Sequence, residues 1–159
     1  MLASVRRYHA SMSGRLNPPH PISPKPKRRS PPYSFVLEAL ASLNPEVRPM
    51  FSGYSVYVGD NIVCMLRDRP NAPEDNGIWL VFADPFDTSD DPKALRHEFP
   101  SIRPIQLLQG KIRHWLILGA DAPNFESESM HFCDLLLARD PRLGRIPESR
   151  KTRNRSRIR

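Results

Sequence analysis

Apolar and polar positions alternate most clearly in residues 47–66, and this pattern predicts a β-hairpin. Residues 54–58 follow the two-residue period of a half-buried strand. Residues 59–61, Gly-Asp-Asn, tolerate positive φ and allow the chain to reverse. The return segment, residues 62–66, is an unbroken apolar run, which is typical of a strand covered on both faces.

The hairpin is flanked by a predicted helix and a predicted third strand. Residues 34–43 place Val36, Leu37, Leu40 and Leu43 on one face of a helix. Asn44-Pro45 ends that helix, because a residue before proline avoids the helical region. Residues 78–82 form a second apolar run after a polar loop, so we expect three antiparallel strands in sequence order.

The second half of the chain predicts a short helix, a hairpin and a final helix. Asp91-Pro92 supplies an N-cap and a first helical residue for a helix that ends before Pro100. Residues 105–108 and 114–118 are apolar and are separated by a turn at 109–111, which predicts a second hairpin. Pro104 lacks an amide donor, so the first of these strands is expected to begin after it or to lie at an edge. The last helix is expected to start at residues 121–123 and to bury a face that reaches Leu137.

The predicted order is therefore α-β-β-β-α-β-β-α. Grouped strands that do not alternate with helices favour an α+β domain with an antiparallel sheet. We expect a single domain over residues 32–149, with five strands packed by helices. Part of one sheet face is expected to stay uncovered, because three helices are few for five strands, and such apolar patches are typical of partner surfaces.

Charge divides the chain into the same domain and two tails. The net charge is +7, yet all 17 acidic residues lie within residues 32–149, together with 11 of the 24 lysines and arginines. The tails, residues 1–31 and 150–159, therefore carry only positive charge. The first is also proline-rich and poor in large apolar residues, so both are predicted to be disordered.

Each basic tail has functional interpretations besides that of a solvated extension. The first fifteen residues have the composition of a transit peptide, and residues 25–29 resemble a nuclear-localisation or polyanion-binding patch. Nucleic acid could bind either tail without sequence preference, since the C-terminal tail has no aromatic residue for base stacking. The candidate polyanion contacts are Lys25, Lys27, Arg28, Arg29, Arg150, Lys151, Arg153, Arg155, Arg157 and Arg159.

Residues 48–54 (RPMFSGY) and 57–60 (YVGD) resemble the N-terminal domain of TfoX/Sxy-type competence regulators. Ser52 stands where that family usually has glycine. The resemblance implies the fold of that domain, which is like that of type III secretion chaperones, and a regulatory role. The matching positions are Met50, Phe51, Gly53, Tyr54, Tyr57, Gly59 and Asp60.

No pattern in the sequence predicts a catalytic, cofactor or metal site. The zinc-protease, nucleophile-elbow, phosphate-loop and EF-hand spacings are absent. Cys64 and Cys133 lie in apolar segments, where burial predicts inert free thiols with raised pKa values. An enzyme would require His97 or His114 to meet a cysteine or an acid in a cleft.

These patterns together predict a non-enzymatic regulatory or protein-interaction module. We expect a cytoplasmic protein that binds a protein partner or itself, without a cofactor, a small-molecule substrate or a membrane. The alternative is a nucleic-acid-associated protein that binds through its basic tails only.

Overall fold

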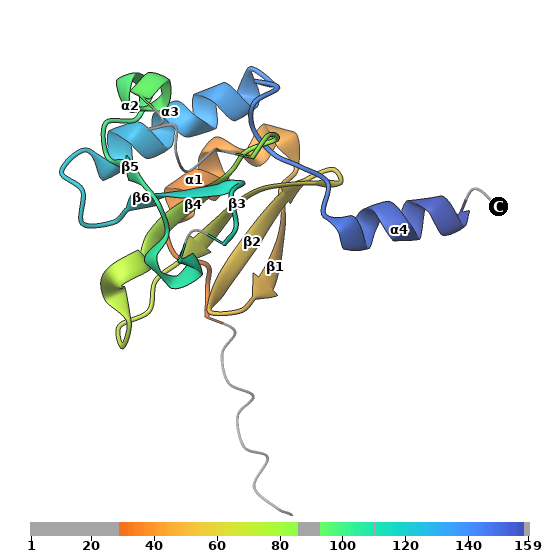
Figure 1. Ribbon diagram of the computed structural model, residues 1–159, viewed down its shortest axis with the longest axis horizontal. Coiled ribbons are helices and arrows are strands. Elements are labelled where there is room, and N and C mark those ends of the chain that lie inside the picture. Colours follow the sequence, from red (N-terminus) through yellow and green to blue (C-terminus); the bar gives the residue numbers. More distant parts are fainter. Residues whose placement is uncertain (1–28, 86–92, 110, 158–159) are drawn as a thin grey trace, which may run out of the picture.

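The computed structural model describes residues 29–85, 93–109 and 111–157, with a six-stranded antiparallel sheet at the centre (Figure 1). The strand order across the sheet is β1-β2-β3-β4-β6-β5. The strands are β1 (Glu46–Met50), β2 (Gly53–Val58), β3 (Asn61–Arg67), β4 (Gly77–Val81), β5 (Ile102–Arg103) and β6 (Trp115–Gly119). The predicted α+β class and the single domain are confirmed.

Helices cover one face of this sheet. The α-helices are α1 (Ser34–Ala39), α2 (Lys93–Glu98), α3 (Phe125–Leu137) and α4 (Glu148–Arg157), and the 3₁₀ turns are η1 (Ala41–Leu43), η2 (Pro73–Asp75) and η3 (Gln106–Leu108). Val36 and Leu40 of the first helical segment and Phe132 of α3 are fully buried against the sheet. The larger core lies here, because alternate residues of β4 and β6, among them Leu80 and Leu118, point to this face.

The predicted hairpin is confirmed and has a further strand. In β2 and β3, Val56 pairs with Cys64, and β3 then pairs with β4 in sequence order. Residues 46–50 are an additional strand, β1, which pairs along its whole length with β2. The expectation of five strands is therefore wrong: the described part of the chain contains six. Pro49 lacks an amide donor, and β1 tolerates it because it lies at the edge of the sheet.

Only one of the two strands predicted for the second hairpin forms. β6 forms as expected, but residues 106–108 form η3 and not a strand. The amides of Gln106 and Leu107 donate to the carboxylate of Asp75 at 3.0 and 2.7 Å, so they are not available to a neighbouring strand. The edge strand is β5, which pairs with β6 before Pro104 and not after it.

Helix bounds also differ from the predictions. The first helix changes to a 3₁₀ turn after Leu40, and α3 begins at Phe125, after the predicted start. The largest difference is at the C-terminus, where the expected disordered tail 150–159 forms α4 as far as Arg157. The predicted N-cap at Asp91, Pro92 beside it and the tail residues 1–28 lie outside the described residues.

The chain reaches α4 by passing between two strands. Ile62 of β3 exchanges both backbone hydrogen bonds with Arg145, and the amide of Gly144 donates to the carbonyl of Val81 at 2.8 Å. Residues 142–145 therefore lie between the end of β4 and the start of β3, which brings α4 to the β2–β3 turn. Among the described helices, none has the length and apolar character needed to cross a membrane.

Gly53 should be essential for the β2–β3 pairing, because a Cβ atom there would lie 2.5 Å from the carbonyl oxygen of Leu66. We expect Gly53→Ala to lower the free energy of unfolding by about 2 kcal/mol, the scale of an overpacked core. Gly59→Ala is the control, since its φ is +60° but nothing lies within 4 Å of the added atom. The free energy of unfolding of Gly59→Ala should fall by only about 1 kcal/mol, the cost of a left-handed conformation for alanine. Urea denaturation measures both, and equal losses would contradict the close approach at Gly53.

Candidate functional site

The second face of the sheet carries a smaller core that is only partly covered. Met65, Trp79 and Ile117 project from β3, β4 and β6, and Ile105 covers them from the segment before η3. Trp115 packs edge-on against Trp79, with ring centroids 6.2 Å apart and an interplanar angle of 89°. No α-helix described in the structure is part of this core, and its outer layer is Leu108 of the short η3 turn together with Met50 at the β1–β2 turn.

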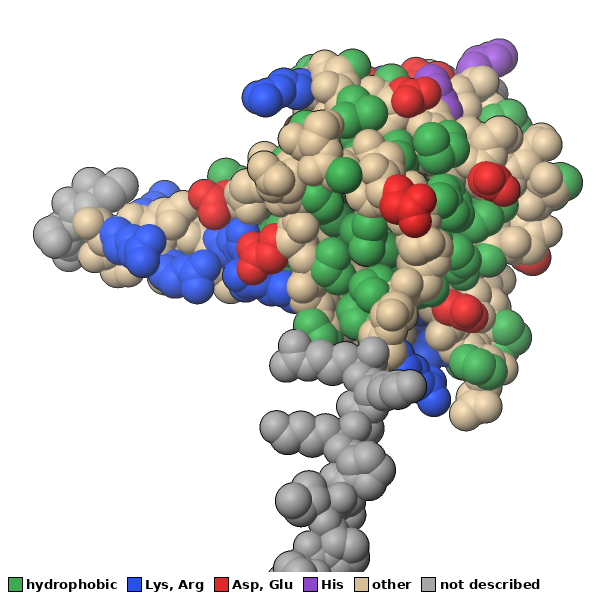
Figure 2. Space-filling model, turned by 180° about the vertical axis from the view of Figure 1, so that it is seen from behind, with side chains coloured by type: hydrophobic (Ala, Val, Ile, Leu, Met, Phe, Trp, Pro, Cys, Tyr) green, Lys and Arg blue, Asp and Glu red, His purple; other side chains and the backbone are tan. Residues whose placement is uncertain are grey.

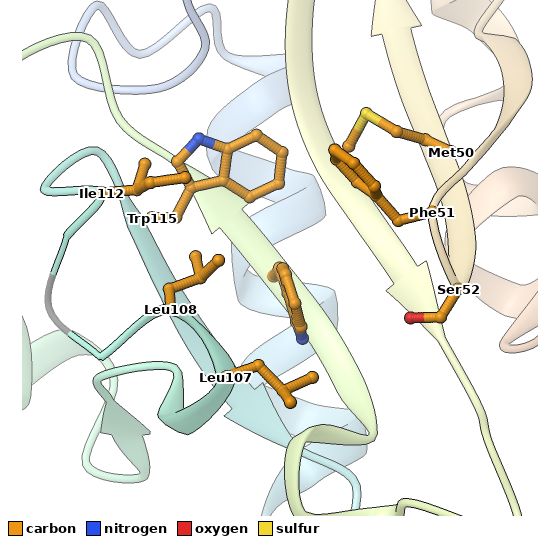
Figure 3. A pocket seen from close by; sticks show the side chains of 8 residues that line it. Met50, Phe51, Ser52, Leu107, Leu108, Ile112 and Trp115 are labelled. Atoms are coloured by element: carbon orange, nitrogen blue, oxygen red, sulfur yellow. The ribbon is translucent and has the colours of Figure 1, made fainter.

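An apolar hollow of about 250 Å³ opens beside this core (Figure 3). Met50 and Phe51 bound it at the β1–β2 turn, while Ile112 and Trp115 lie across from them. Among the described residues that line it, Ser52 is the only one with a polar side chain other than the two tryptophans. These residues are Met50, Phe51, Ser52, Trp79, Leu107, Leu108, Ile112 and Trp115.

The rim of the hollow exposes large apolar side chains. Phe51 is 96% exposed, Leu107 is 55% exposed and Ile112 is 45% exposed. Phe51 also has a φ of +50°, in the left-handed region that non-glycine residues rarely adopt. The sheet thus presents an aromatic ring to solvent from a strained backbone position.

A buried arginine fixes the turn that carries Phe51. Arg67 is 2% exposed, and its Nε donates to the hydroxyl of Ser52 at 3.0 Å. Its Nη1 donates to the carbonyl of Ala72 and to Oδ1 of Asn76, both at 2.9 Å. Ser52 is therefore the residue through which Arg67 holds the β1–β2 turn.

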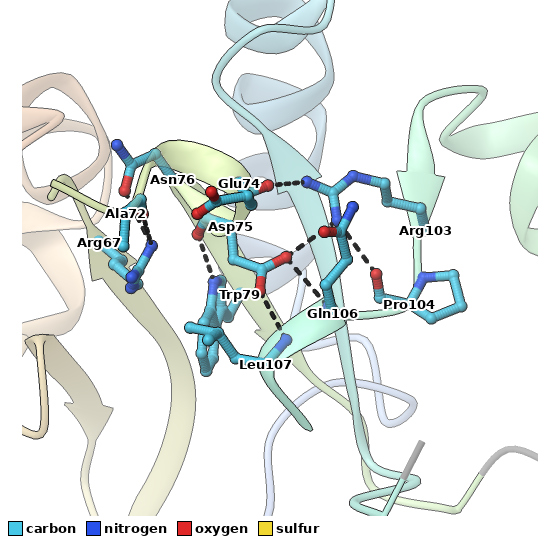
Figure 4. A network of polar contacts seen from close by, with 10 residues as sticks. All are labelled: Arg67, Ala72, Glu74, Asp75, Asn76, Trp79, Arg103, Pro104, Gln106 and Leu107. Atoms are coloured by element: carbon cyan, nitrogen blue, oxygen red, sulfur yellow. Dashed lines mark hydrogen bonds and ion pairs between the residues drawn. The ribbon is translucent and has the colours of Figure 1, made fainter. Parts of the chain in front are cut away.

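A buried carboxylate fixes the opposite side of the hollow (Figure 4). Asp75 is fully buried in η2, and its oxygens accept hydrogen bonds from the amides of Gln106 and Leu107 and from Nη1 of Arg103 at 3.0 Å. The carbonyl of Asp75 accepts from Nε1 of Trp79 at 2.9 Å. One residue thus joins η2, η3, β5 and β4.

The pKa of Asp75 lies below its usual range. Burial alone would raise it, but the hydrogen bonds from Leu107, Gln106 and Arg103 stabilise the anion and outweigh burial. Asp75 is therefore a structural anion that positions the hollow.

The residues that carry the family resemblance lie in two groups. Met50, Phe51 and Gly53 are at the β1–β2 turn beside the hollow. Tyr57, Gly59 and Asp60 are at the other end of β2 and contact α4. Between the groups, the hydroxyl of Tyr54 donates to the carbonyl of Arg29 at 2.8 Å.

Arg150 does not fit its predicted role as a polyanion contact. It is 7% exposed, and its guanidinium lies 3.9 Å from the centre of the Tyr57 ring. Nη1 donates to the carbonyl of Gly59 at 3.0 Å, and the side chain pairs with Asp60 and Glu46 at 3.5 Å. The remaining described residues of the C-terminal set, Lys151, Arg153, Arg155 and Arg157, are exposed on α4.

The residues considered for chemistry are dispersed. Cys64 and Cys133 are buried free thiols in the larger core. Burial raises the pKa of both, that of Cys133 to about 11. His114 contacts the carbonyl of Phe82 through Nδ1 at 3.2 Å, and His97 is exposed. Within the described residues, no three His, Cys, Asp or Glu side chains are grouped so that they could hold a metal ion.

The sequence predicts an uncovered part of one sheet face, but it does not single out Asp75, Arg67 or the hollow itself. Nothing in the spacing of Asp75 distinguishes it from the other acids of its polar loop. Its role arises because η3, which follows 31 residues later in the chain, folds over it.

In comparisons with known proteins, no protein-family model, no curated protein sequence and no solved structure matches this chain. The resemblance to TfoX/Sxy regulators therefore depends on the motif residues alone.

Asp75→Asn should destabilise the domain by about 3 kcal/mol at pH 7, because it removes the anion and leaves Arg103 and two amides poorly paired. The folded pKa of Asp75 is lowered, so its contribution is present above the unfolded carboxyl pKa of about 4 and is lost as the pH falls below it. The difference between wild type and variant should thus be constant from pH 7 to about 5 and shrink below about pH 4. Urea denaturation across this pH range measures the difference in unfolding free energy. Asp84→Asn is the control, because Asp84 is exposed. A difference independent of pH would contradict this role.

Proposed function

We propose that this protein is a non-enzymatic protein-interaction module that uses the apolar hollow of its second sheet face to hold side chains of a partner. The observation that carries the proposal is Phe51, which is 96% exposed beside the hollow with a φ of +50°. Neither property stabilises the fold. A left-handed conformation costs about 1 kcal/mol for a non-glycine residue, and an exposed ring buries almost nothing.

The composition of the hollow favours a protein partner over a small molecule. Small-molecule sites usually reach about 300–1,000 Å³ and include several polar groups that orient the ligand. This hollow is smaller, and the indole nitrogen of Trp79, a strong potential donor in its wall, already donates to the Asp75 carbonyl. An apolar side chain of a protein needs no such orienting group, and aromatic residues are frequent anchors of protein interfaces.

The rigid supports on both sides suit the same role. Arg67 holds the turn of Phe51 through Ser52, and Asp75 holds Leu107 on η3. Preorganised walls reduce the entropy that binding would otherwise lose. A second copy of the chain could supply the inserted side chain, and the resemblance to the N-terminal domain of TfoX/Sxy regulators supports a regulatory partner.

Phe51→Gly should separate binding from folding. Glycine adopts the left-handed conformation without strain, so the free energy of unfolding should stay unchanged or rise by up to about 1 kcal/mol. Partner binding should fall at least tenfold, as for loss of an aromatic hot-spot residue. Denaturation measures the first effect. Quantitative affinity capture of the full chain, with sedimentation to detect self-association, measures the second.

Leu137→Ser is the matched control, because Leu137 is 40% exposed on α3. Proteins captured by wild type should be retained by Leu137→Ser and lost by Phe51→Gly. If both variants capture the same proteins and sediment as wild type does, the hollow is not the interaction surface.

A further inference from the structure

Helix α4 is distinctive because it contains only polar and charged side chains, ESRKTRNRSR. A helix that lies on a membrane or against a protein core needs an apolar face, and α4 has none. It projects away from the domain, with Lys and Arg side chains along it (Figures 1 and 2). Its surface is therefore suited to a hydrophilic, negatively charged ligand.

The domain fixes this helix along its first two turns. The guanidinium of Arg150 stacks on the Tyr57 ring and donates a hydrogen bond to the carbonyl of Gly59. Nδ2 of Asn154 donates to the carboxylate of Asp60 at 3.4 Å. A ten-residue helix with like charges four residues apart is unstable on its own. The sheet thus presents α4 as an ordered element, and Arg150 is its positioning residue.

The remaining basic residues form two rows on opposite sides of α4. At about 100° per residue, Lys151 and Arg155 lie about 40° apart on one side. Arg153 and Arg157 form the other row, about 200° around the helix from the first. All four side chains are exposed. Arg150 and Asn154 face the domain between the rows.

The outward edge of α4 carries small hydroxyl residues. By the same geometry Thr152 and Ser156 lie on the side opposite Arg150, between the two basic rows. Both hydroxyls donate to carbonyls of their own helix, those of Glu148 and Arg153. The helix therefore has a narrow outer edge flanked by Arg155 on one side and by Arg153 and Arg157 on the other, while Lys151 is paired with Glu148 at 2.9 Å at the start of the helix.

We propose that α4 binds duplex DNA by entering the major groove with this edge, while the two basic rows contact the phosphates of the two strands. A helix is about 10–12 Å wide and the major groove of B-form DNA is about 12 Å wide. Arginine also matches phosphate geometry with two parallel hydrogen bonds. The short hydroxyl side chains offer little base readout, so binding is governed by the backbone and is independent of sequence. This inference does not depend on the proposed function of the hollow.

The test measures binding of the full chain to a labelled duplex DNA of 20 base pairs by fluorescence anisotropy. One variant is Arg153→Gln, Arg155→Gln and Arg157→Gln combined. The control is Lys25→Gln, Lys27→Gln and Arg28→Gln combined, which removes the same charge from the other tail. At 50 mM salt we expect the α4 variant to lose at least about tenfold in affinity and the control less than about threefold. The slope of log affinity against log salt concentration should also become less steep for the α4 variant, by the amount expected for the loss of about three phosphate contacts.

Three other polyanions test whether α4 enters the major groove of duplex DNA. Duplex RNA of the same sequence should bind more weakly, because its major groove is too narrow for a helix. Single-stranded DNA should also bind more weakly, since α4 has no aromatic residue for stacking. Polyglutamate of equal charge should compete poorly. Equal losses in the two charge variants, equal binding of the competing polyanions, or absence of binding at 50 mM salt would each overturn the proposal.

Discussion

The carboxylate of Asp75 is the interaction on which the second face of the sheet depends. It is fully buried, and it accepts hydrogen bonds from two amides of η3 and from Arg103, while its own carbonyl accepts from Trp79. A buried anion is tolerated only when such donors surround it, so the groups around Asp75 are constrained together. This constraint holds η3 over the apolar residues of β3, β4 and β6.

The two faces of the sheet are closed in different ways. α1 and α3 cover one face with long apolar side chains, whereas in the described part of the chain the other face has only the short η3 turn and the β1–β2 turn. Arg67 fixes the second of these turns through Ser52. The hollow is what remains between two polar supports, and this explains why an almost wholly apolar surface keeps a defined shape beside exposed Phe51 and Leu107.

Strand β1 connects the two surfaces that we assign to partners. Its last residue, Met50, borders the hollow, and its first residue, Glu46, pairs with Arg150 at the base of α4. Five strand residues span about 17 Å, so the apolar hollow and the basic helix lie at opposite ends of the β1–β2 pair. Gly53 supports one of these ends, and Tyr57, Gly59 and Asp60 support the other.

Local patterns in the sequence were sufficient for the α+β class, for β2, β3, β4 and β6, and for the approximate positions of α1 and α3, because period and turn chemistry act over a few residues. Residues 106–108 could not be assigned correctly in this way, since their apolar pattern suits a strand and only contact with Asp75 makes them a turn. The same limit applies to Arg150. In sequence it is one basic residue among six in its tail, and only the folded sheet brings Tyr57 and Gly59 against it. The sequence alone therefore determined which segments bury apolar surface, and the tertiary structure decided which polar groups meet, because such pairs join residues that lie far apart in the chain.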